Sequence, residues 1–167
     1  MELFFDYPLE EHHFRAIVRY NKSSPNTIQK QLAEWQQEQL IQFSGKKGNL
    51  MLYRANREST HFIQKKRLYN LTKLLESPLM NLLEKIDPEC VILFGSYLYG
   101  TDTSESDIDI AIISEKKEEI SQNRLKALEK HLKRKISIHV INLQETEQEL
   151  KNNLINGFVL YGYLKTP

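Results

Sequence analysis

The stretch that decides the fold runs from Val91 to Ser114 and reads VILFGSYLYGTDTSESDIDIAIIS. A short apolar run ends at Gly95 and Ser96, a polar loop follows, and a second apolar run begins through Asp107 and Asp109. Side chains two residues apart on a strand point to the same face of a sheet. The two carboxylates would therefore repel each other, which costs free energy unless a cation lies beside them.

The residues around the two carboxylates indicate what accompanies that cation. Gly95 permits close approach of the backbone to a ligand, and the Ser96 hydroxyl can bond a phosphate oxygen. Isoleucines alternate with Asp107 and Asp109, so the carboxylates share one face of the sheet and the isoleucines the other. Two carboxylates opposite a phosphate-binding turn are typical of a Mg²⁺–triphosphate site, where the metal neutralises charge as an oxygen attacks phosphorus.

This arrangement resembles the signature of the DNA polymerase beta nucleotidyltransferase superfamily, in particular its minimal nucleotidyltransferase branch. The signature is Gly-Ser, a loop, and Asp-x-Asp or Asp-x-Glu; here ten residues, Tyr97 to Ser106, separate the two parts. Beyond it, KALEKHLKRK, ISIHVINL and LINGFVLYGYL resemble the family's helix, third strand and C-terminal helix with an apolar segment. The resemblance covers nearly the whole chain and is tight at residues 91–114.

The resemblance implies a role for each matching residue. Gly95 and Ser96 would hold the β- and γ-phosphates of a nucleoside triphosphate, with ATP the expected nucleotide. Asp107 and Asp109 would ligate Mg²⁺. In the family a third carboxylate, on the strand after the helix, binds the metal that activates the acceptor hydroxyl, and His139 stands where that acid is expected.

His139 has three interpretations. It acts as a general base, a role that imidazole suits near neutral pH; it selects a softer metal such as Mn²⁺; or the site binds nucleotide without turnover. Two acids of the loop, Asp102 and Glu105, could replace the missing charge, although their spacing gives no reason to expect it. Tyr97 is a second departure, because many relatives carry a basic residue directly after Gly-Ser.

The front half of the chain has the pattern of two helices joined by a turn. HHFRAIVRY, residues 12–20, places apolar residues at helical spacing. Ser24 and Pro25 then suit the N-cap and first position of a second helix, whose apolar stripe would face the core. Its polar face carries Asn26, Gln29 and Lys30, side-chain types that can bond base edges or phosphates of DNA.

A hairpin with a basic tip follows the second helix. Residues 40–43 and 50–54 suggest short strands, and SGKKGN between them presents Lys46 and Lys47. Helix, turn, helix and basic hairpin is the order of a winged helix-turn-helix that binds double-stranded DNA. The front half also resembles winged-helix modules fused to such nucleotidyltransferase domains. Taken singly, each part has a simpler explanation: the stripe is core, and the lysines lie in a solvated turn.

Composition describes an ordinary globular chain with an uneven charge distribution. The net charge of +1 over 167 residues divides into +5 for residues 1–74 and −4 for residues 75–167, which suggests a polyanion partner for the front and a cation for the rear. The lone Cys90 is expected in the core, and His12 and His13 at the surface. No apolar run reaches the roughly 18 residues of a membrane span, so we expect a cytoplasmic protein with no membrane partner.

The predicted fold is α/β (α+β), with three parts. Residues 1–60 form a winged helix-turn-helix, residues 61–79 a connecting helix, and residues 80–167 a nucleotidyltransferase domain with a mixed sheet flanked by helices. The predicted function is transfer of a nucleoside monophosphate from Mg–NTP to an unknown hydroxyl, with catalysis by Asp107, Asp109 and His139. A protein acceptor is one option, as relatives that act as antitoxins would imply.

Two other functions compete with this prediction. One is a DNA-binding transcriptional regulator whose rear domain senses nucleotide without catalysis, which the missing third acid favours. The other is an antibiotic-modifying nucleotidyltransferase, although we expect the chain to be too short for the extra substrate-binding domain that such enzymes usually need. A homodimer through the leucine-rich helix at residues 68–75 is a further option, and core packing explains those leucines equally well.

Overall fold

The computed structural model describes residues 1–86, 88–114, 121–143 and 146–165. The chain divides into two compact units, Met1–Tyr69 and Asn70–Pro167, here called unit 1 and unit 2. The boundary falls inside helix α4 (Thr60–Leu75). Each unit has its own hydrophobic core.

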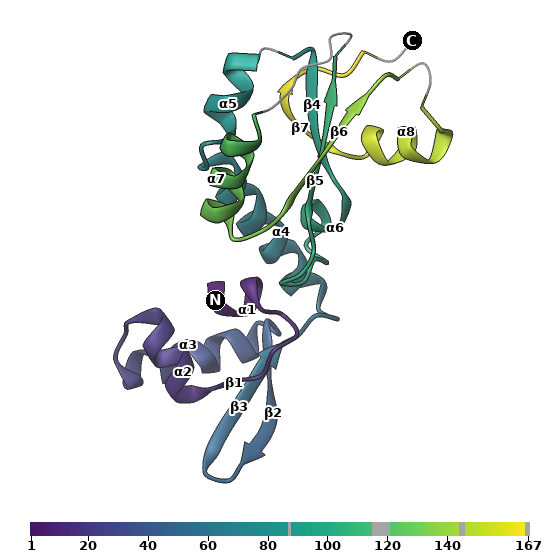
Figure 1. Ribbon diagram of the computed structural model, residues 1–167. Helices are drawn as coiled ribbons and strands as arrows, with labels where there is room; N and C mark the ends of the chain where they lie inside the picture. Colours follow the sequence, from purple (N-terminus) through teal and green to yellow (C-terminus); the bar gives the residue numbers. More distant parts are fainter. Residues whose placement is uncertain (87, 115–120, 144–145, 166–167) are drawn as a thin grey trace. The chain divides into compact units, whose positions relative to one another are not determined.

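Unit 1 combines helices with a small antiparallel sheet (Figure 1). Its strands pair in the order β1-β3-β2, so the first strand lies beside the last. Along the chain the elements are α1 (Glu2–Asp6), β1 (His12–His13), α2 (Phe14–Asn21), α3 (Pro25–Gln37), β2 (Ile41–Lys47), β3 (Leu50–Ala55) and the first part of α4.

The second helix of the front half forms as its sequence predicts. The Ser24 hydroxyl accepts a hydrogen bond from the Thr27 N–H at 3.2 Å, and Pro25 occupies the first helical turn. Ile28 and Leu32 are buried on the inner face of α3. Leu40, three residues after the end of the helix, is also buried and belongs to the core of unit 1.

The front half also differs from expectation in two places. His12 was expected at the surface but is 6% exposed, because it begins β1 and packs its ring edge-on against Phe4 of α1. Strand β2 continues through Lys46 and Lys47, so the hairpin turn is Gly48–Asn49 alone. The β2–β3 pairing tolerates this length through a register shift between Phe43 and Gly45.

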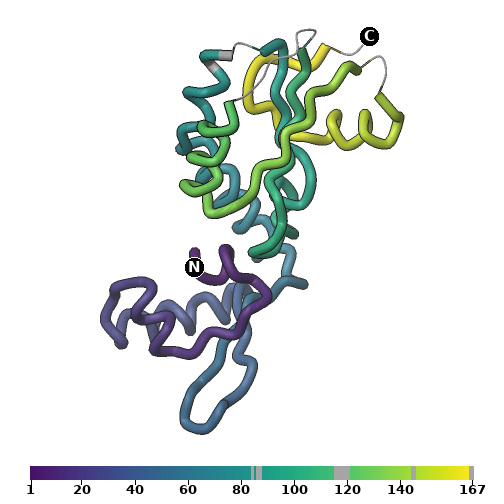
Figure 2. Tube along the Cα trace, in the orientation of Figure 1, coloured from purple at the N-terminus to yellow at the C-terminus, as the bar shows by residue number. Residues whose placement is uncertain are grey.

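Unit 2 is a four-stranded mixed sheet with helices on both faces (Figures 1 and 2). The strand order is β6-β5-β4-β7; β5 and β6 run parallel, and the other pairs are antiparallel. Its elements are α5 (Leu79–Ile86), β4 (Cys90–Phe94), α6 (Gly95–Tyr99), β5 (Ile108–Ile113), α7 (Gln122–Leu132), β6 (Ile136–Ile141), α8 (Gln148–Ile155) and β7 (Phe158–Gly162).

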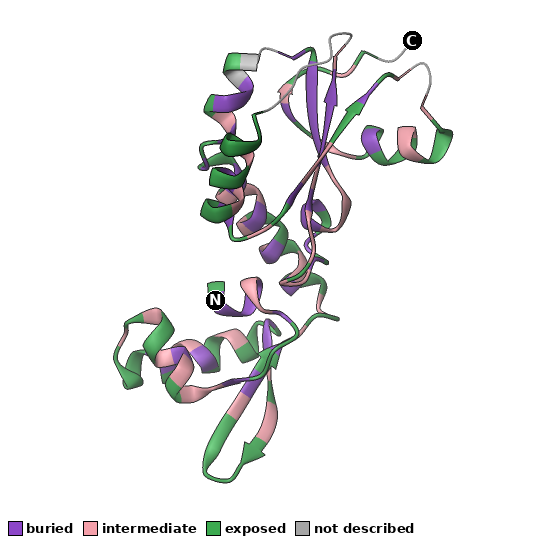
Figure 3. Ribbon diagram, in the orientation of Figure 1, coloured by how far each residue is buried: buried purple, intermediate pink, exposed green. Residues whose placement is uncertain are grey.

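The two faces of this sheet bury different residues, as strand alternation requires. Val91 and Leu93 of β4 pack in the core shared with α5 and α7, whereas Cys90 and Ile92 pack in the core shared with α8. The expected burial of Cys90 is therefore confirmed, and its thiol is free. Figure 3 shows the central strands almost wholly buried. Among the described helices, none is long and apolar enough to cross a membrane.

Candidate functional site

The candidate site lies where β4 ends and β5 begins. The pairing of Phe94 with Asp109 places Asp109 directly beside Gly95, the next residue of the chain. Gly95 has φ +76°, and a Cβ there would overlap Oδ2 of Asp109. Only glycine therefore fits both the backbone angle and the space. The two halves of the motif, separated in sequence by a loop, meet at this point.

Strand β6 brings two more polar side chains to the same face. In the parallel register Asp109 lies opposite Ser137, and Ala111 opposite His139. The Ser137 hydroxyl donates a hydrogen bond to Oδ2 of Asp107 at 3.1 Å. Nε2 of His139 lies 3.8 Å from Oδ1 of Asp109. The structure thus brings Asp107, Asp109 and His139 together beside Gly95.

Burial and neighbouring charges determine the electrostatics of Asp109. Burial raises the pKa of its carboxyl; His139 acts in the opposite direction, and the charge of Asp107 raises the pKa further. The Asp109 side chain is 30% exposed and that of His139 is 46% exposed. A solute can therefore reach both groups from outside.

The oxygen donors of this site suit a hard cation that is also coordinated by a substrate. Among the described residues, no group of three or more His, Cys, Asp and Glu side chains is arranged to hold a metal. Mg²⁺ commonly takes one or two carboxylates and completes its shell with water and substrate phosphates. Asp107 and Asp109 fit that requirement. His139, a nitrogen donor, suits it less.

Ser137 and Phe94 join this site without having been singled out in the sequence. The Phe94 ring lies 5.5 Å from the His139 ring, centroid to centroid, with their planes tilted by 58°. Phe94 therefore restricts where the imidazole can turn. Ser137 follows the same alternation as His139 on β6, which is the signal that could have found it.

A buried polar network anchors the loop that leads to Asp107. The Asn70 amide donates to Oδ1 of Asp102 and to the Tyr97 carbonyl, both at 2.8 Å. Arg134 lies 3.5 Å from Oδ2 of Asp102 and donates to the Thr103 carbonyl. The Asp102 side chain is 0% exposed, so it does not replace the missing third acid.

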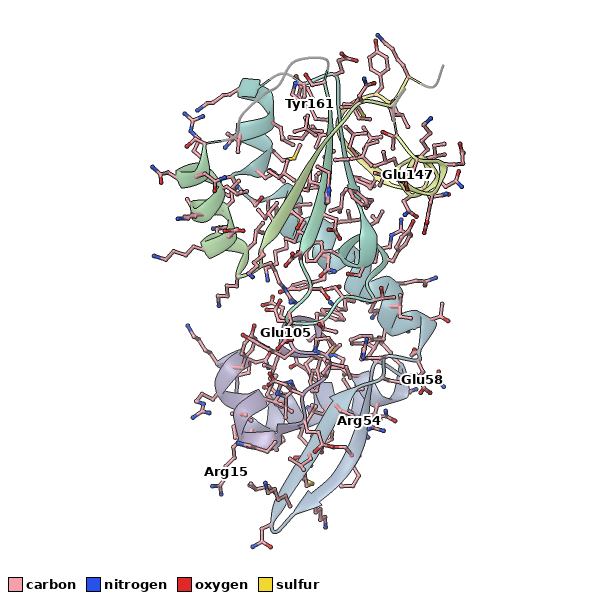
Figure 4. The ribbon with its side chains drawn as sticks, turned by 45° about the vertical axis from the view of Figure 1, so that its right-hand side comes forward. Arg15, Arg54, Glu58, Glu105, Glu147 and Tyr161 are labelled. Atoms are coloured by element: carbon pink, nitrogen blue, oxygen red, sulfur yellow. The ribbon has the colours of Figure 1, made fainter. Side chains whose placement is uncertain are left out.

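Two sequence expectations about α6 and the loop that follows it can be judged from their packing. Tyr97, where the sequence resemblance led us to expect a basic residue, is 2% exposed and belongs to the core of unit 2. This position therefore faces the core and offers no contact to a phosphate in solvent. Glu105, labelled in Figure 4, is exposed on the loop between α6 and β5.

The residues predicted to contact DNA belong to unit 1 and form a separate set. Asn26, Gln29 and Lys30 are exposed on α3, and Lys46 and Lys47 are exposed on β2. A shallow hollow of about 450 Å³ follows the outer face of α3 and is lined in part by Asn26 and Lys30. The outer face of this helix is thus open to a partner.

Comparison with known proteins identifies the family of unit 2. No curated protein matches the chain. Residues 78–165 match the family described as "Polymerase beta, Nucleotidyltransferase". The match begins just before α5, ends beyond β7, and includes the Gly95–Ser96 turn, both aspartates and His139. Because it spans more than half of the chain, the chain belongs to the polymerase beta nucleotidyltransferase family.

Proposed function

We propose that unit 2 transfers a nucleoside monophosphate from a nucleoside triphosphate, with ATP the expected donor, to a hydroxyl of an acceptor. The observation that carries this proposal is the contact between the two halves of the motif, where the Asp109 carboxylate packs against Gly95. Family membership supports the same reaction class, since these enzymes generally use a divalent metal and a nucleoside triphosphate.

Each residue of the site has a role in this reaction. Gly95 and Ser96 hold the β- and γ-phosphates, and Asp107 and Asp109 would hold Mg²⁺ or Mn²⁺. When bound, the metal neutralises charge on the triphosphate. Ser137 orients the Asp107 carboxylate through its hydrogen bond. The acceptor hydroxyl attacks the α-phosphorus, the bond to the β-phosphate breaks, and pyrophosphate leaves.

His139 is the residue that accepts the proton of the attacking hydroxyl. A ring nitrogen of imidazole can accept a proton, and Phe94 and Asp109 both lie beside the His139 ring and restrict its orientation. This role replaces the third carboxylate of the family without adding negative charge. A protein side chain and a small molecule both offer the required hydroxyl.

Calorimetric titration tests this proposal without knowledge of the acceptor. ATP, CTP, GTP and UTP are titrated with Mg²⁺ or Mn²⁺ into the wild-type chain and into Asp107→Asn with Asp109→Asn. We expect metal-dependent binding of at least one nucleotide to the wild type and its loss in the double variant. Glu149→Gln, an exposed carboxylate of α8, is the matched control. Binding that survives the double substitution would contradict the proposal.

His139→Gln separates catalysis from nucleotide sensing. A general base contributes about 10²- to 10⁴-fold to a rate. We expect His139→Gln to bind nucleotide as the wild type does and to release pyrophosphate at least about 10²-fold more slowly. A wild-type chain that binds nucleotide but releases no pyrophosphate with any acceptor would favour the sensing alternative, a DNA-binding regulator with an inactive transferase domain.

The second candidate function is DNA binding by unit 1 as a winged helix-turn-helix. The element order of unit 1 supports it: two helices separated by a short turn, then a hairpin whose strand carries Lys46 and Lys47. The exposed Asn26, Gln29 and Lys30 on the second of these helices support it further. DNA binding and transfer are compatible, and a homodimer would suit a two-fold DNA site.

A further inference from the structure

A second, basic pocket lies beside Asp107 in unit 2. Its volume is about 620 Å³, and it is formed by residues 104–107, the second half of α7 and residues 133–135. Five basic side chains line it: Lys126, Lys130, Lys133, Arg134 and Lys135. The family comparison and the proposed transfer reaction leave this pocket without a role.

The lysines gather here because of their spacing on one helix. Lys126 and Lys130 lie four residues apart on α7, so they share one face. Lys133 is the C-cap residue that directly follows the helix, and it lines the same pocket. Like charges on one helix face destabilise the helix by a few tenths of a kcal/mol per pair. The helix dipole stabilises Lys130, which lies in the last turn of α7, and an anionic ligand would relieve the repulsion between the two lysines.

The other charged groups of the pocket are mostly engaged within the protein. Arg134 is tied to Asp102 and to the Thr103 carbonyl, and Oε1 of Glu129 accepts the N–H of Ile136 at 3.1 Å. The four lysines are exposed, and within the described ranges none of them forms an ion pair. Their ammonium groups are therefore available to a ligand.

We propose that this lysine pocket is a second phosphate-binding subsite, which holds phosphate groups of the acceptor. The proposal deepens the proposed function, on which it rests. The donor triphosphate belongs at the Gly95–Ser96 turn, and Asp107 lines the lysine pocket, so a molecule held there can present its hydroxyl near the aspartates. Flexible lysines bind phosphates as point charges without fixed geometry.

The lining also indicates which part of the acceptor is recognised. Among the described residues that line the pocket, none is aromatic, so they offer a base no ring to stack on, and the contacts that they offer are with phosphates. The acceptor hydroxyl then forms a bond to the α-phosphorus of the nucleotide, its proton passes to His139, and pyrophosphate leaves. A nucleic-acid strand and a phosphorylated small molecule share this chemistry, and the experiment distinguishes them.

The test measures binding of two probes to one pair of variants. Lys126→Gln with Lys130→Gln removes two charges from the pocket, and Lys85→Gln with Lys151→Gln removes two charges elsewhere in unit 2. All chains also carry Lys30→Gln, Lys46→Gln and Lys47→Gln, so that unit 1 does not bind the probes. The probes are inorganic tripolyphosphate and a short single-stranded oligonucleotide, both titrated without divalent metal so that the metal-dependent donor site does not bind them.

We expect the pocket variant to bind both probes at least tenfold more weakly than the control variant, while both variants bind Mg–ATP equally well. A higher affinity for the strand than for tripolyphosphate identifies a nucleic-acid acceptor, and similar affinities identify a smaller phosphorylated acceptor. Equal probe binding by the two variants would overturn the proposal. A parallel loss of Mg–ATP affinity would also overturn it, because the lysines would then serve the donor.

Failure of the proposed function gives a different result. If no nucleotide binds to the wild-type chain, the transferase site is inactive. The comparison of tripolyphosphate binding between the pocket variant and the control variant still tests the lysine pocket. Displacement of the probes by polyglutamate at similar concentration would show that the pocket accepts any polyanion, and this outcome also overturns the phosphate-binding subsite.

Discussion

Gly95 is a position where an added methyl group would disturb the proposed nucleotide site. Replacement by alanine places a Cβ into Oδ2 of Asp109 and forces alanine to φ +76°. The backbone angle alone costs about 1 kcal/mol. The added Cβ would also push the Asp109 carboxylate out of the position in which it would bind the metal. We predict that Gly95→Ala abolishes metal-dependent nucleotide binding measured by calorimetry.

Gly48→Ala is the matched control for this substitution. Gly48 also has a positive φ of +59°, but no atom lies within 4 Å of the added Cβ. We expect only a small loss of stability and unchanged nucleotide binding. Wild-type nucleotide affinity in Gly95→Ala would show that Asp109 does not need its position against Gly95.

His12 makes the stability of unit 1 depend on pH. Burial lowers the pKa of this histidine; its hydrogen bond to the Tyr7 carbonyl and the charge of Glu10 act in the opposite direction, and His13 lowers the pKa further. The unfolded chain therefore binds the proton more readily than the folded one, and stability falls as the pH drops through about 6.5. At higher pH this loss is absent.

Urea unfolding at pH 7.5 and 5.5 checks this prediction. Trp35 is the lone tryptophan of the chain and packs against the core of unit 1, so its fluorescence reports that unit. His12→Gln keeps a donor for Tyr7 and should reduce the difference between the two midpoints. His131→Gln changes an exposed histidine of unit 2 and should leave the difference as it is. An undiminished difference in His12→Gln would assign the effect to another group.

At the scale of elements, the loop between α6 and β5 is held by charge buried in the interior of unit 2. Removal of one partner of a buried ion pair typically costs about 3–5 kcal/mol, because the other charge stays buried. Asp102→Ala leaves the Arg134 guanidinium, whose side chain is 7% exposed, without that carboxylate. We predict a loss of this size, measured by denaturant-dependent hydrogen exchange of the β5 amides.

An exposed ion pair provides the comparison for Asp102→Ala. Lys65 and Glu38 of unit 1 lie 2.6 Å apart with side chains 41% and 44% exposed, and such pairs contribute little to stability. Glu38→Ala should leave the unfolding of unit 1 nearly unchanged. If Asp102→Ala were equally mild, Arg134 and Asn70 would have other partners sufficient to hold the loop.

The same loop shows where sequence reasoning succeeds and where it stops. Alternation of Asp107 and Asp109 with isoleucines is a local property, so their common face follows from the sequence alone. The burial of Asp102 cannot be predicted from the sequence, because its partners Asn70 and Arg134 are distant in sequence and only the fold brings them together. Alternation on β6 could have placed Ser137 on the face of His139, but its hydrogen bond to Asp107 depends on the register of β6 beside β5.

Helices follow the same rule. The cap at Ser24 and the break at Pro78 are local signals, and the helices begin and end near them. Sequence spacing does not predict which leucines of the leucine-rich stripe of α4 are buried. Leu74 is fully buried, whereas Leu68 is 64% exposed and Leu75 is 41% exposed. Core packing accounts for part of this stripe, and the homodimer proposed above would use the exposed part.

At the scale of the whole molecule, charge is divided along the sequence. Residues 1–74 carry a net charge of +5 and residues 75–167 carry −4. The predicted DNA contacts belong to the basic part, and the aspartates of the transferase site to the acidic part. The two proposed activities, polyanion binding and nucleotide binding, should therefore be separable by substitution.

Duplex DNA binding measured over a range of salt concentrations tests this separation. Each lysine that contacts a phosphate contributes about one unit to the slope of log affinity against log salt. We predict that Lys46→Gln with Lys47→Gln weakens binding to duplexes of any sequence and reduces the slope by about two. Asp107→Asn with Asp109→Asn should keep the wild-type slope while it loses nucleotide binding, because these residues belong to unit 2.

Lys85→Gln with Lys151→Gln controls for the change in total charge. A slope that stays unchanged in the hairpin variant would remove β2 from the DNA interface, and loss of DNA binding in the aspartate variant would mean that nucleotide occupancy controls the DNA-bound state.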